Sequence, residues 1–143
     1  MSHKIPIYQP SLTGNEKKYV LDCLDSTWIS SKGKYIQQFE EAFAKKVEAR
    51  YATTVSNGTV AIHLALLALG LGEGDEIIVP TLTYIASVNA IKYTNATPVF
   101  VDSLADSWQM DPEDVKRKIT PRTKAVMAVH LYGHPCDMDA LQQ

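Results

Sequence analysis

The chain has 143 residues, a net charge of −2, 45% hydrophobic residues and 21% charged residues. This balance is typical of a folded globular protein and excludes a disordered chain. No long block of one charge sign occurs, which argues against nucleic acid or an anionic membrane as a partner. The longest apolar run, residues 61–69, is too short to span a bilayer.

Two cysteines, Cys23 and Cys136, are too few for a disulfide framework. Residues 1–16 contain no apolar core of a signal peptide. We therefore expect a cytoplasmic protein with reduced thiols.

Two helices are predicted in the first 50 residues. Segment 4–12 is punctuated by prolines and should be extended. Thr13 and Glu16 have the spacing of a capping box, which predicts a helix from there to about Ser26. Apolar spacing puts four residues on one face of this helix: Tyr19, Val20, Cys23 and Leu24. After the loop "STWISSKGKY", a second helix is predicted because aromatic and aliphatic residues recur every fourth position: Tyr35, Phe39, Phe43 and Val47.

From Tyr51 onward, short apolar runs alternate with helical patterns. Strands are predicted at 51–55, 76–80 and 97–102 and within 124–133. Helices are predicted at 59–70 and 85–93, after an Asp111 cap with Pro112 at the first position, and after an Asp137 cap. This alternation predicts an α/β fold with a parallel sheet covered on both faces.

Two features of this half carry further expectations. The helix at 59–70 is so apolar that we expect it to be almost wholly buried. The last helix is given neither length nor a C-terminal cap, so we expect the chain to be the N-terminal part of a longer protein.

The turn Ser56-Asn57-Gly58-Thr59 is a candidate anion site. It joins a predicted strand to a helix, and the free N–H groups of a helix start suit a phosphate. Gly58 permits close approach, and the hydroxyls of Ser56 and Thr59 could add donors. The alternative is that Ser56 or Asn57 only caps the helix, which is the more common use of such residues.

Tyr84 is a candidate aromatic contact because it follows the carboxyl end of the strand at 76–80. Parallel α/β sheets bind ligands at that edge. The anion turn is predicted at the same end of its own strand, so the two loops should converge on one ligand with a planar group. The alternative is that Tyr84 is a packed residue at the start of a helix.

A histidine and cysteine group near the end of the chain suggests zinc at first sight: His130, His134, Cys136 and Asp137. Its spacing matches no common structural zinc pattern, so we expect no metal. His130 or Tyr132 is instead a candidate to reach a ligand, since both follow a predicted strand. His63 and Cys23 lie on helices among apolar residues and are interpreted as structural.

The loop "STWISSKGKY" places Trp28 beside Ser30 and Ser31. An aromatic ring next to hydroxyl groups is suited to a sugar or a base. The alternative is that Trp28 anchors the loop onto the core.

Several segments, in order, resemble the N-terminal portion of the DegT/DnrJ/EryC1/StrS family of nucleotide-sugar aminotransferases. They are "PSLTGNEKKYVLDCLDSTWISSKGKYIQQFEEAFA", "TVSNGTVAIHLALLALGLGEGDEIIVPTLTYIASVNAI", "ATPVFVD" and "TPRTKAVMAVHLYGHPCDMDAL". The resemblance implies the large domain of a fold-type I aminotransferase that depends on pyridoxal 5'-phosphate (PLP). That domain is a three-layer αβα structure with a mostly parallel sheet, and this chain would hold only part of it. We assign 1–50 to an N-terminal segment on the substrate side and 51–143 to the first part of the PLP-binding domain.

The resemblance also assigns roles to residues of this chain. Gly58 and Thr59 match the family's phosphate cup, in a turn that also contains Ser56 and Asn57. Tyr84 matches the aromatic residue that stacks on the cofactor ring. Trp28 and Ser30 match the segment that lines the nucleotide-sugar side.

The family's aspartate at the pyridine nitrogen and its Schiff-base lysine are expected beyond Gln143. This chain would then contain no catalytic residue and would be inactive alone.

The implied reaction is transamination of a nucleotide-linked 4-keto-6-deoxy sugar, with GDP-4-keto-6-deoxymannose as the expected substrate and glutamate as the amino donor. Such enzymes serve polysaccharide biosynthesis and are homodimers with the active site at the interface. Two alternatives stay open at this point. One is a sugar 3-dehydratase of the same family, in which histidine replaces the lysine. The other is a non-catalytic module that only binds the cofactor.

Overall fold

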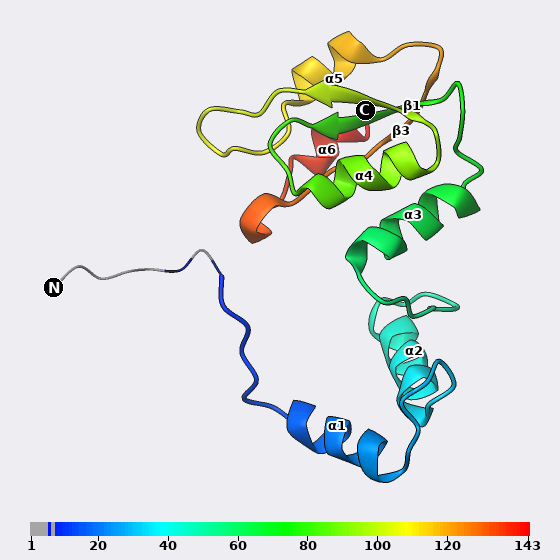
Figure 1. The fold of residues 1–143 in the computed structure, drawn as a ribbon. Coiled ribbons are helices and arrows are strands. Elements are labelled where there is room, and N and C mark those ends of the chain that lie inside the picture. Colours follow the sequence, from blue (N-terminus) through cyan, green and yellow to red (C-terminus); the bar gives the residue numbers. More distant parts are fainter. Residues whose placement is uncertain (1–5, 7) are drawn as a thin grey trace, which may run out of the picture. The chain divides into compact units, whose positions relative to one another are not determined.

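A computed structural model describes Pro6 and residues 8–143. The chain divides into two compact units, Met1–Thr54 and Val55–Gln143 (Figure 1). We call them the N-terminal unit and the C-terminal unit and describe each by itself. Part of the predicted extended segment, residues 4, 5 and 7, lies outside the described residues. Residues 8–12 belong to neither a helix nor a strand.

The N-terminal unit contains two helices, α1 (Glu16–Asp25) and α2 (Lys34–Lys46), as predicted. The predicted N-terminal cap of α1 is wrong by two positions, because Asn15, not Thr13, is the cap residue. The Glu16 carboxylate turns back and accepts the N–H of Gly14 at 2.9 Å. The Thr13 hydroxyl lies 3.4 Å from that of Ser11 instead of capping the helix.

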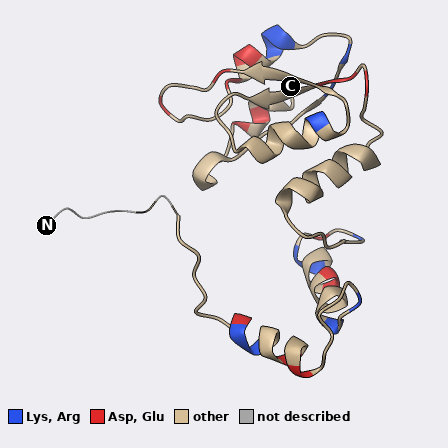
Figure 2. Ribbon diagram, in the orientation of Figure 1, with Lys and Arg blue, Asp and Glu red and all other residues tan. Residues whose placement is uncertain are grey.

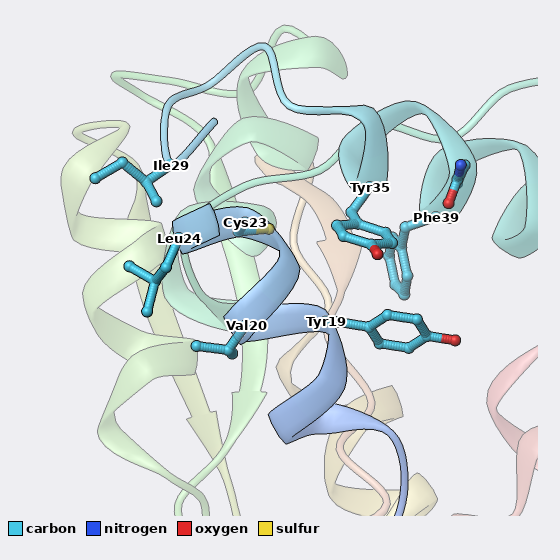
Figure 3. A pocket seen from close by; sticks show the side chains of 8 residues that line it. Tyr19, Val20, Cys23, Leu24, Ile29, Tyr35 and Phe39 are labelled. Atoms are coloured by element: carbon cyan, nitrogen blue, oxygen red, sulfur yellow. The ribbon is translucent and has the colours of Figure 1, made fainter. Parts of the chain in front are cut away.

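The predicted apolar faces of α1 and α2 are confirmed except for Val47, which is the cap residue after the end of α2. The rings of Tyr19 and Tyr35 lie 4.9 Å apart, and Phe39 and Phe43 stack at 5.6 Å. The predicted α1 face lines an apolar cavity of about 460 Å³ (Figure 3). Asp22 joins the two helices, because it accepts the Tyr35 hydroxyl at 2.9 Å and pairs with Lys34 at 2.7 Å.

The C-terminal unit is an α/β structure. Its elements are α3 (Gly58–Ala68), β1 (Glu76–Pro80), α4 (Ile85–Tyr93), β2 (Thr97–Val101), α5 (Pro112–Lys118), β3 (Thr123–Val126), η1 (Leu131–Gly133) and α6 (Met138–Leu141). The strands form one sheet in the order β2-β1-β3, with both pairs parallel. The predicted parallel sheet is therefore confirmed, with β1 at its centre.

Three side chains cap helices of this unit. Asn57 accepts the N–H of Val60 at 3.0 Å at the start of α3. Asp111 accepts the N–H of Glu113 at 2.9 Å, and Asp137 accepts that of Ala140 at 3.0 Å. The caps predicted at Asp111 and Asp137 are confirmed.

The predicted cover on both faces is found for the central strand β1, whereas β2 and β3 are partly exposed. Because side chains alternate along a strand, Ile77 and Val79 of β1 point to one face and Ile78 to the other. The first face packs against a cluster that includes Leu66 of α3 and Ile91 of α4. On the second face Ile78 packs with four residues, Val101, Met110, Val115 and Cys136. The result is three layers, with the core on either side of β1.

Two buried carboxylates make hydrogen bonds and ion pairs at the edges of this core. Glu76 of β1 accepts the Thr120 hydroxyl and pairs with Arg122, and these bonds lower the pKa of Glu76. Asp114 of α5 pairs with Lys118 at 2.9 Å and accepts the N–H of Asp102 at 2.8 Å. Its pKa falls from the ordinary 3.8 to about 2, first because of the bond from Lys118 and then because of the Asp102 amide.

The predicted strand at 51–55 is wrong. These residues form no strand in the structure. The N–H and hydroxyl of Thr54 both donate to the Glu40 carboxylate, at 2.7 Å and 2.8 Å. A β-rich sequence becomes a strand only when a neighbouring strand pairs with its backbone, and here a side chain takes that amide.

The expected burial of α3 is also wrong. Leu66 is its one buried residue among those described, whereas Leu64 is 43% exposed and Leu67 is 52% exposed. One face of α3 packs on α4 and the core, whereas Leu64 and Leu67 on the remaining surface are largely exposed. Helix α3 is therefore apolar on a side that this structure leaves open.

Candidate functional site

The start of α3 offers two backbone donors. Asn57 is the cap, its side chain takes the Val60 N–H, and its carbonyl takes the Ala61 N–H at 3.1 Å. Gly58 and Thr59 open the helix, so their amides have no intrahelical partner, and no hydrogen bond among the described residues occupies them. The structure thus confirms capping by Asn57 and still leaves two free N–H groups beside it.

The space at this helix start is open. A methyl group built on Gly58 would meet no atom within 4 Å. The α3 sequence carries no Lys, Arg, Asp or Glu, as Figure 2 shows. An anion would therefore be held by amides and by the positive end of the helix dipole, with no α3 carboxylate to repel it.

Tyr84 lies at the start of α4, just beyond the carboxyl end of β1. It is the N-terminal cap residue of α4, makes no capping hydrogen bond with its side chain, and is 72% exposed. The alternative that Tyr84 is packed in the core is therefore wrong. Its ring is free to meet a flat ligand.

The helix starts of α3 and α4 lie on the same side of the C-terminal unit. The two helices pack together and run in the same direction (Figure 1). Ile62, one turn into α3, and Ser87, in the first turn of α4, line one cavity of about 460 Å³. The convergence of the two loops was expected from two strand ends, and the first of those strands does not form. None of Gly58, Thr59 and Tyr84 lines this cavity, so the convergence of the loops stays a prediction.

The turn after β3 reaches the same cavity. His130 lines it together with Ile62 and Ser87. The His130 Nδ1 atom accepts the N–H of Cys136 at 3.0 Å, and the Cys136 thiol bonds to the carbonyl of Val129 at 3.3 Å. Within the residues that the structure describes, no group of three or more His, Cys, Asp or Glu side chains could hold a metal ion.

Tyr132, the other candidate after this strand, is 75% exposed and has a left-handed backbone with φ of 53°. His63, interpreted as structural, packs edge-on against the ring of Tyr93 at 5.6 Å.

Trp28 and Ser30 belong to the N-terminal unit. Trp28 is 56% exposed, so it does not anchor its loop by burial, and Ser30 is exposed. The Ser30 carbonyl accepts the N–H of Gly33 at 3.4 Å, which closes the turn before α2. Ile29, between them, lines the cavity of Figure 3.

Two site residues were missed by the sequence analysis. Ser87 gives no motif, although its position three residues after Tyr84 puts it in the first turn of the same helix. Gln109 lies in an irregular loop between β2 and α5, where no periodic pattern marks it. It is 3% exposed and bonds to the backbone of Leu131, a pairing that only the folded structure shows.

The chain belongs to the DegT/DnrJ/EryC1/StrS aminotransferase family, whose model matches residues 10–143. It is 72% identical over 137 residues to GDP-perosamine synthase of Escherichia coli O157:H7, covering 96% of this chain and 38% of that protein. The solved aminotransferase from Psychrobacter cryohalolentis is 40% identical with a TM-score of 0.85, over 93% of this chain and 34% of that one.

A GDP-4-keto-6-deoxy-D-mannose-3-dehydratase from Escherichia coli, solved with bound hydrated PLP, is 31% identical with a TM-score of 0.85. The match covers 97% of this chain and 37% of that one. The predicted fold class is thereby confirmed as part of the fold-type I large domain. The chain spans about 38% of the length of its curated relative. No helix among the described residues combines the length and apolar character needed to cross a membrane.

Proposed function

We propose that this chain supplies the phosphate-binding part of a PLP-dependent aminotransferase. Its substrate would be GDP-4-keto-6-deoxymannose, its amino donor glutamate and its product GDP-perosamine. The observation that carries this proposal is the 72% identity to a GDP-perosamine synthase across 96% of the chain. Because the match covers 137 of the 143 residues, it spans both candidate loops, 56–59 and 81–84.

The residues present fit the cofactor. The free amides of Gly58 and Thr59 suit its phosphate, and the open space above Gly58 lets an anion approach the backbone. The Thr59 hydroxyl, and the Ser56 hydroxyl on the same turn, are further donors. Asn57 would shape this cup as its cap. The exposed ring of Tyr84 suits the flat pyridine. When bound, PLP supplies an electron sink that allows an amino group to pass between an amino acid and a keto sugar.

The remaining roles fall to other parts of the protein. We infer that Trp28 and Ser30 contact the nucleotide sugar, which their exposure supports. We place the catalytic lysine and the aspartate at the pyridine nitrogen outside these 143 residues, so that this chain holds the cofactor but does not catalyse alone. By analogy with the family, we also infer a cytoplasmic homodimer that serves polysaccharide biosynthesis, such as that of O-antigen.

The test uses the protein at the full length that its gene encodes. It is incubated with PLP, glutamate labelled with nitrogen-15, and GDP-4-keto-6-deoxymannose, and the sugar product is analysed by mass spectrometry. We expect the label to appear in the sugar, at the carbon that carried the ketone. The matched control omits PLP from protein freed of cofactor and should give no labelled product.

Two outcomes would contradict the proposal. A sugar that carries no label and has lost its 3-hydroxyl would assign the protein to the dehydratase branch, to which the chain is also similar. PLP binding with no change in the sugar would favour a module that only binds the cofactor.

A further inference from the structure

The turn after β3 is held in a conformation that its sequence alone would not favour. Tyr132 has a φ of 53°, and Gly133 follows with a φ of 82°. A tyrosine in the left-handed region is strained, so the surrounding contacts must hold it there. Such strain is a reason to look for a function at this turn.

Gln109 is the first of these contacts. Its side-chain oxygen accepts the N–H of Leu131 at 3.1 Å, and its Nε2 donates to the Leu131 carbonyl at 3.3 Å. The same Nε2 lies 3.3 Å from the carbonyl of Ser107. Because Gln109 is 3% exposed, water does not compete for these bonds. The buried amide therefore fixes the backbone next to His130.

Cys136 is the second contact, and it fixes the ring of His130. Its backbone N–H lies 3.0 Å from the Nδ1 atom of His130. A backbone N–H can only donate, so Nδ1 must be the unprotonated nitrogen. The neutral ring then carries its single N–H on Nε2. Cys136 is itself 4% exposed, and its thiol bonds to the carbonyl of Val129.

The position of His130 suits a ligand contact. It lines one cavity with Ile62 of α3 and Ser87 of α4, the helices whose starts hold Gly58 and Tyr84. Figure 1 shows η1, which begins directly after His130, on the side of the unit where α4 begins. No hydrogen bond among the described residues uses Nε2 of His130, so a fixed N–H donor is available on the side of the unit where α4 begins.

We propose that His130 is a ligand-binding residue that donates its Nε2–H to an anionic oxygen in the active site, and that Gln109 and Cys136 are its positioning residues. This inference rests on the proposed function. The oxygen belongs either to the bound cofactor or to the carboxylate of the amino donor. Both offer the same chemistry, and the experiment separates them.

The experiment follows the imidazole nitrogens by long-range NMR in the full-length protein labelled with nitrogen-15 histidine. Without ligand, His130 is expected to carry its N–H on Nε2, because Nδ1 accepts the Cys136 N–H. Addition of PLP alone should shift the Nε2 resonance if the cofactor supplies the oxygen. A shift that needs glutamate as well would assign the oxygen to the amino donor. An imidazole protonated at Nδ1 would overturn the proposal.

Variants give an independent measurement. His130→Leu removes the donor from an exposed position and should weaken binding of the ligand identified by NMR about tenfold, the worth of one hydrogen bond to a charged group. His130→Gln retains an N–H at the end of the side chain and should recover part of that loss. His134→Leu, an exposed histidine on the same turn, is the matched control and should bind like the wild type. Gln109→Leu should broaden or shift the His130 resonances before ligand is added.

The outcomes separate this inference from the proposed function. Wild-type protein that binds PLP while every His130 resonance stays unchanged in both arms would overturn the role of His130 and leave the proposed function standing. Equal ligand affinity in His130→Leu and His134→Leu would do the same. Wild-type protein that binds no PLP would overturn both.

Discussion

Asn57 and Gly58 are neighbours with different tasks at the start of α3. The Asn57 side chain and carbonyl satisfy the amides of Val60 and Ala61. The amides of Gly58 and Thr59 are left for a ligand. Helix stability and phosphate binding are thus carried by different atoms, and substitutions can separate them.

Substitutions of Asn57 should affect stability and binding differently. Asn57→Ala removes the cap and should lower the free energy of unfolding by about 1 kcal/mol. Asn57→Asp keeps a capping oxygen and should retain the stability, but its negative charge beside the proposed phosphate should weaken PLP binding. Thermal melting and a PLP titration measure the two effects. Wild-type PLP affinity in Asn57→Asp would place the phosphate elsewhere.

Gly58→Ala tests the approach of the phosphate to the backbone. A methyl group there meets no protein atom within 4 Å, so the melting temperature should not fall. The same methyl group would enter the space assigned to the phosphate and should weaken PLP binding about tenfold. The control is Gly72→Ala, far along the chain in a turn, which should leave PLP affinity unchanged. Equal affinity in Gly58→Ala and the wild type would count against the cup.

At the scale of elements, the sequence predicted a helix or strand correctly where one segment contained both the hydrophobic pattern and the residues that mark its ends. The apolar run 76–80 and the helix 85–93 were predicted with the bounds found for β1 and α4. Asp111 followed by Pro112 marked the start of α5 because both the cap and the fixed φ of proline act locally.

Predictions failed where the outcome depends on a distant partner. Segment 51–55 has strand propensity, but Glu40, more than ten residues earlier, takes the amide of Thr54. The composition of α3 suggests burial on all sides, yet burial depends on what packs against each face. The role of Gln109 could not be predicted for the same reason, because its partner Leu131 lies in a distant part of the chain. Gly58, Thr59 and Tyr84 were predicted as cofactor residues from nearby strand and helix boundaries and from the family resemblance, and these roles stay predictions.

The uneven burial of α3 predicts contrasting effects for two adjacent leucines. Leu66 is 5% exposed and packs in the core, so Leu66→Ala should lower the free energy of unfolding by about 2–4 kcal/mol. Leu67 is 52% exposed, so Leu67→Ala in this 143-residue chain should change it by less than about 0.5 kcal/mol. Urea denaturation of both variants makes the comparison. Similar losses would mean that both faces of α3 are packed.

At the scale of the whole molecule, the candidate residues are divided between two compact units, and each unit is considered by itself. The proposed cofactor residues Gly58, Thr59 and Tyr84 belong to the C-terminal unit, as does His130, whereas Trp28 and Ser30 belong to the N-terminal unit. The proposed cofactor residues belong to the unit whose central strand β1 is packed on both faces. The stability of this unit therefore depends on contacts at the edges of the sheet, above all those of the Glu76 and Asp114 carboxylates.

Asp114 makes the stability of the C-terminal unit sensitive to acid. Its folded pKa is about 2, below the ordinary 3.8, because Lys118 and the Asp102 amide stabilise the carboxylate. A depressed folded pKa contributes stability above the unfolded pKa, and this contribution is lost as the pH falls through the folded value. Glu76 acts in the same direction, since Thr120 and Arg122 lower its pKa. We therefore expect the melting temperature to fall progressively from about pH 4 to pH 2.

Asp114→Asn isolates this contribution. The amide cannot pair with Lys118 or Arg117, so the variant should melt well below the wild type at pH 7. The difference should shrink toward pH 2, where the wild-type carboxylate is itself becoming protonated. Glu113→Gln, in the same helix but 69% exposed in its side chain, is the matched control and should follow the wild-type profile, because an exposed ion pair contributes little. Melting curves at half-unit pH steps measure all three proteins. A constant difference between Asp114→Asn and the wild type across this range would show that Asp114 acts through packing and not through its charge.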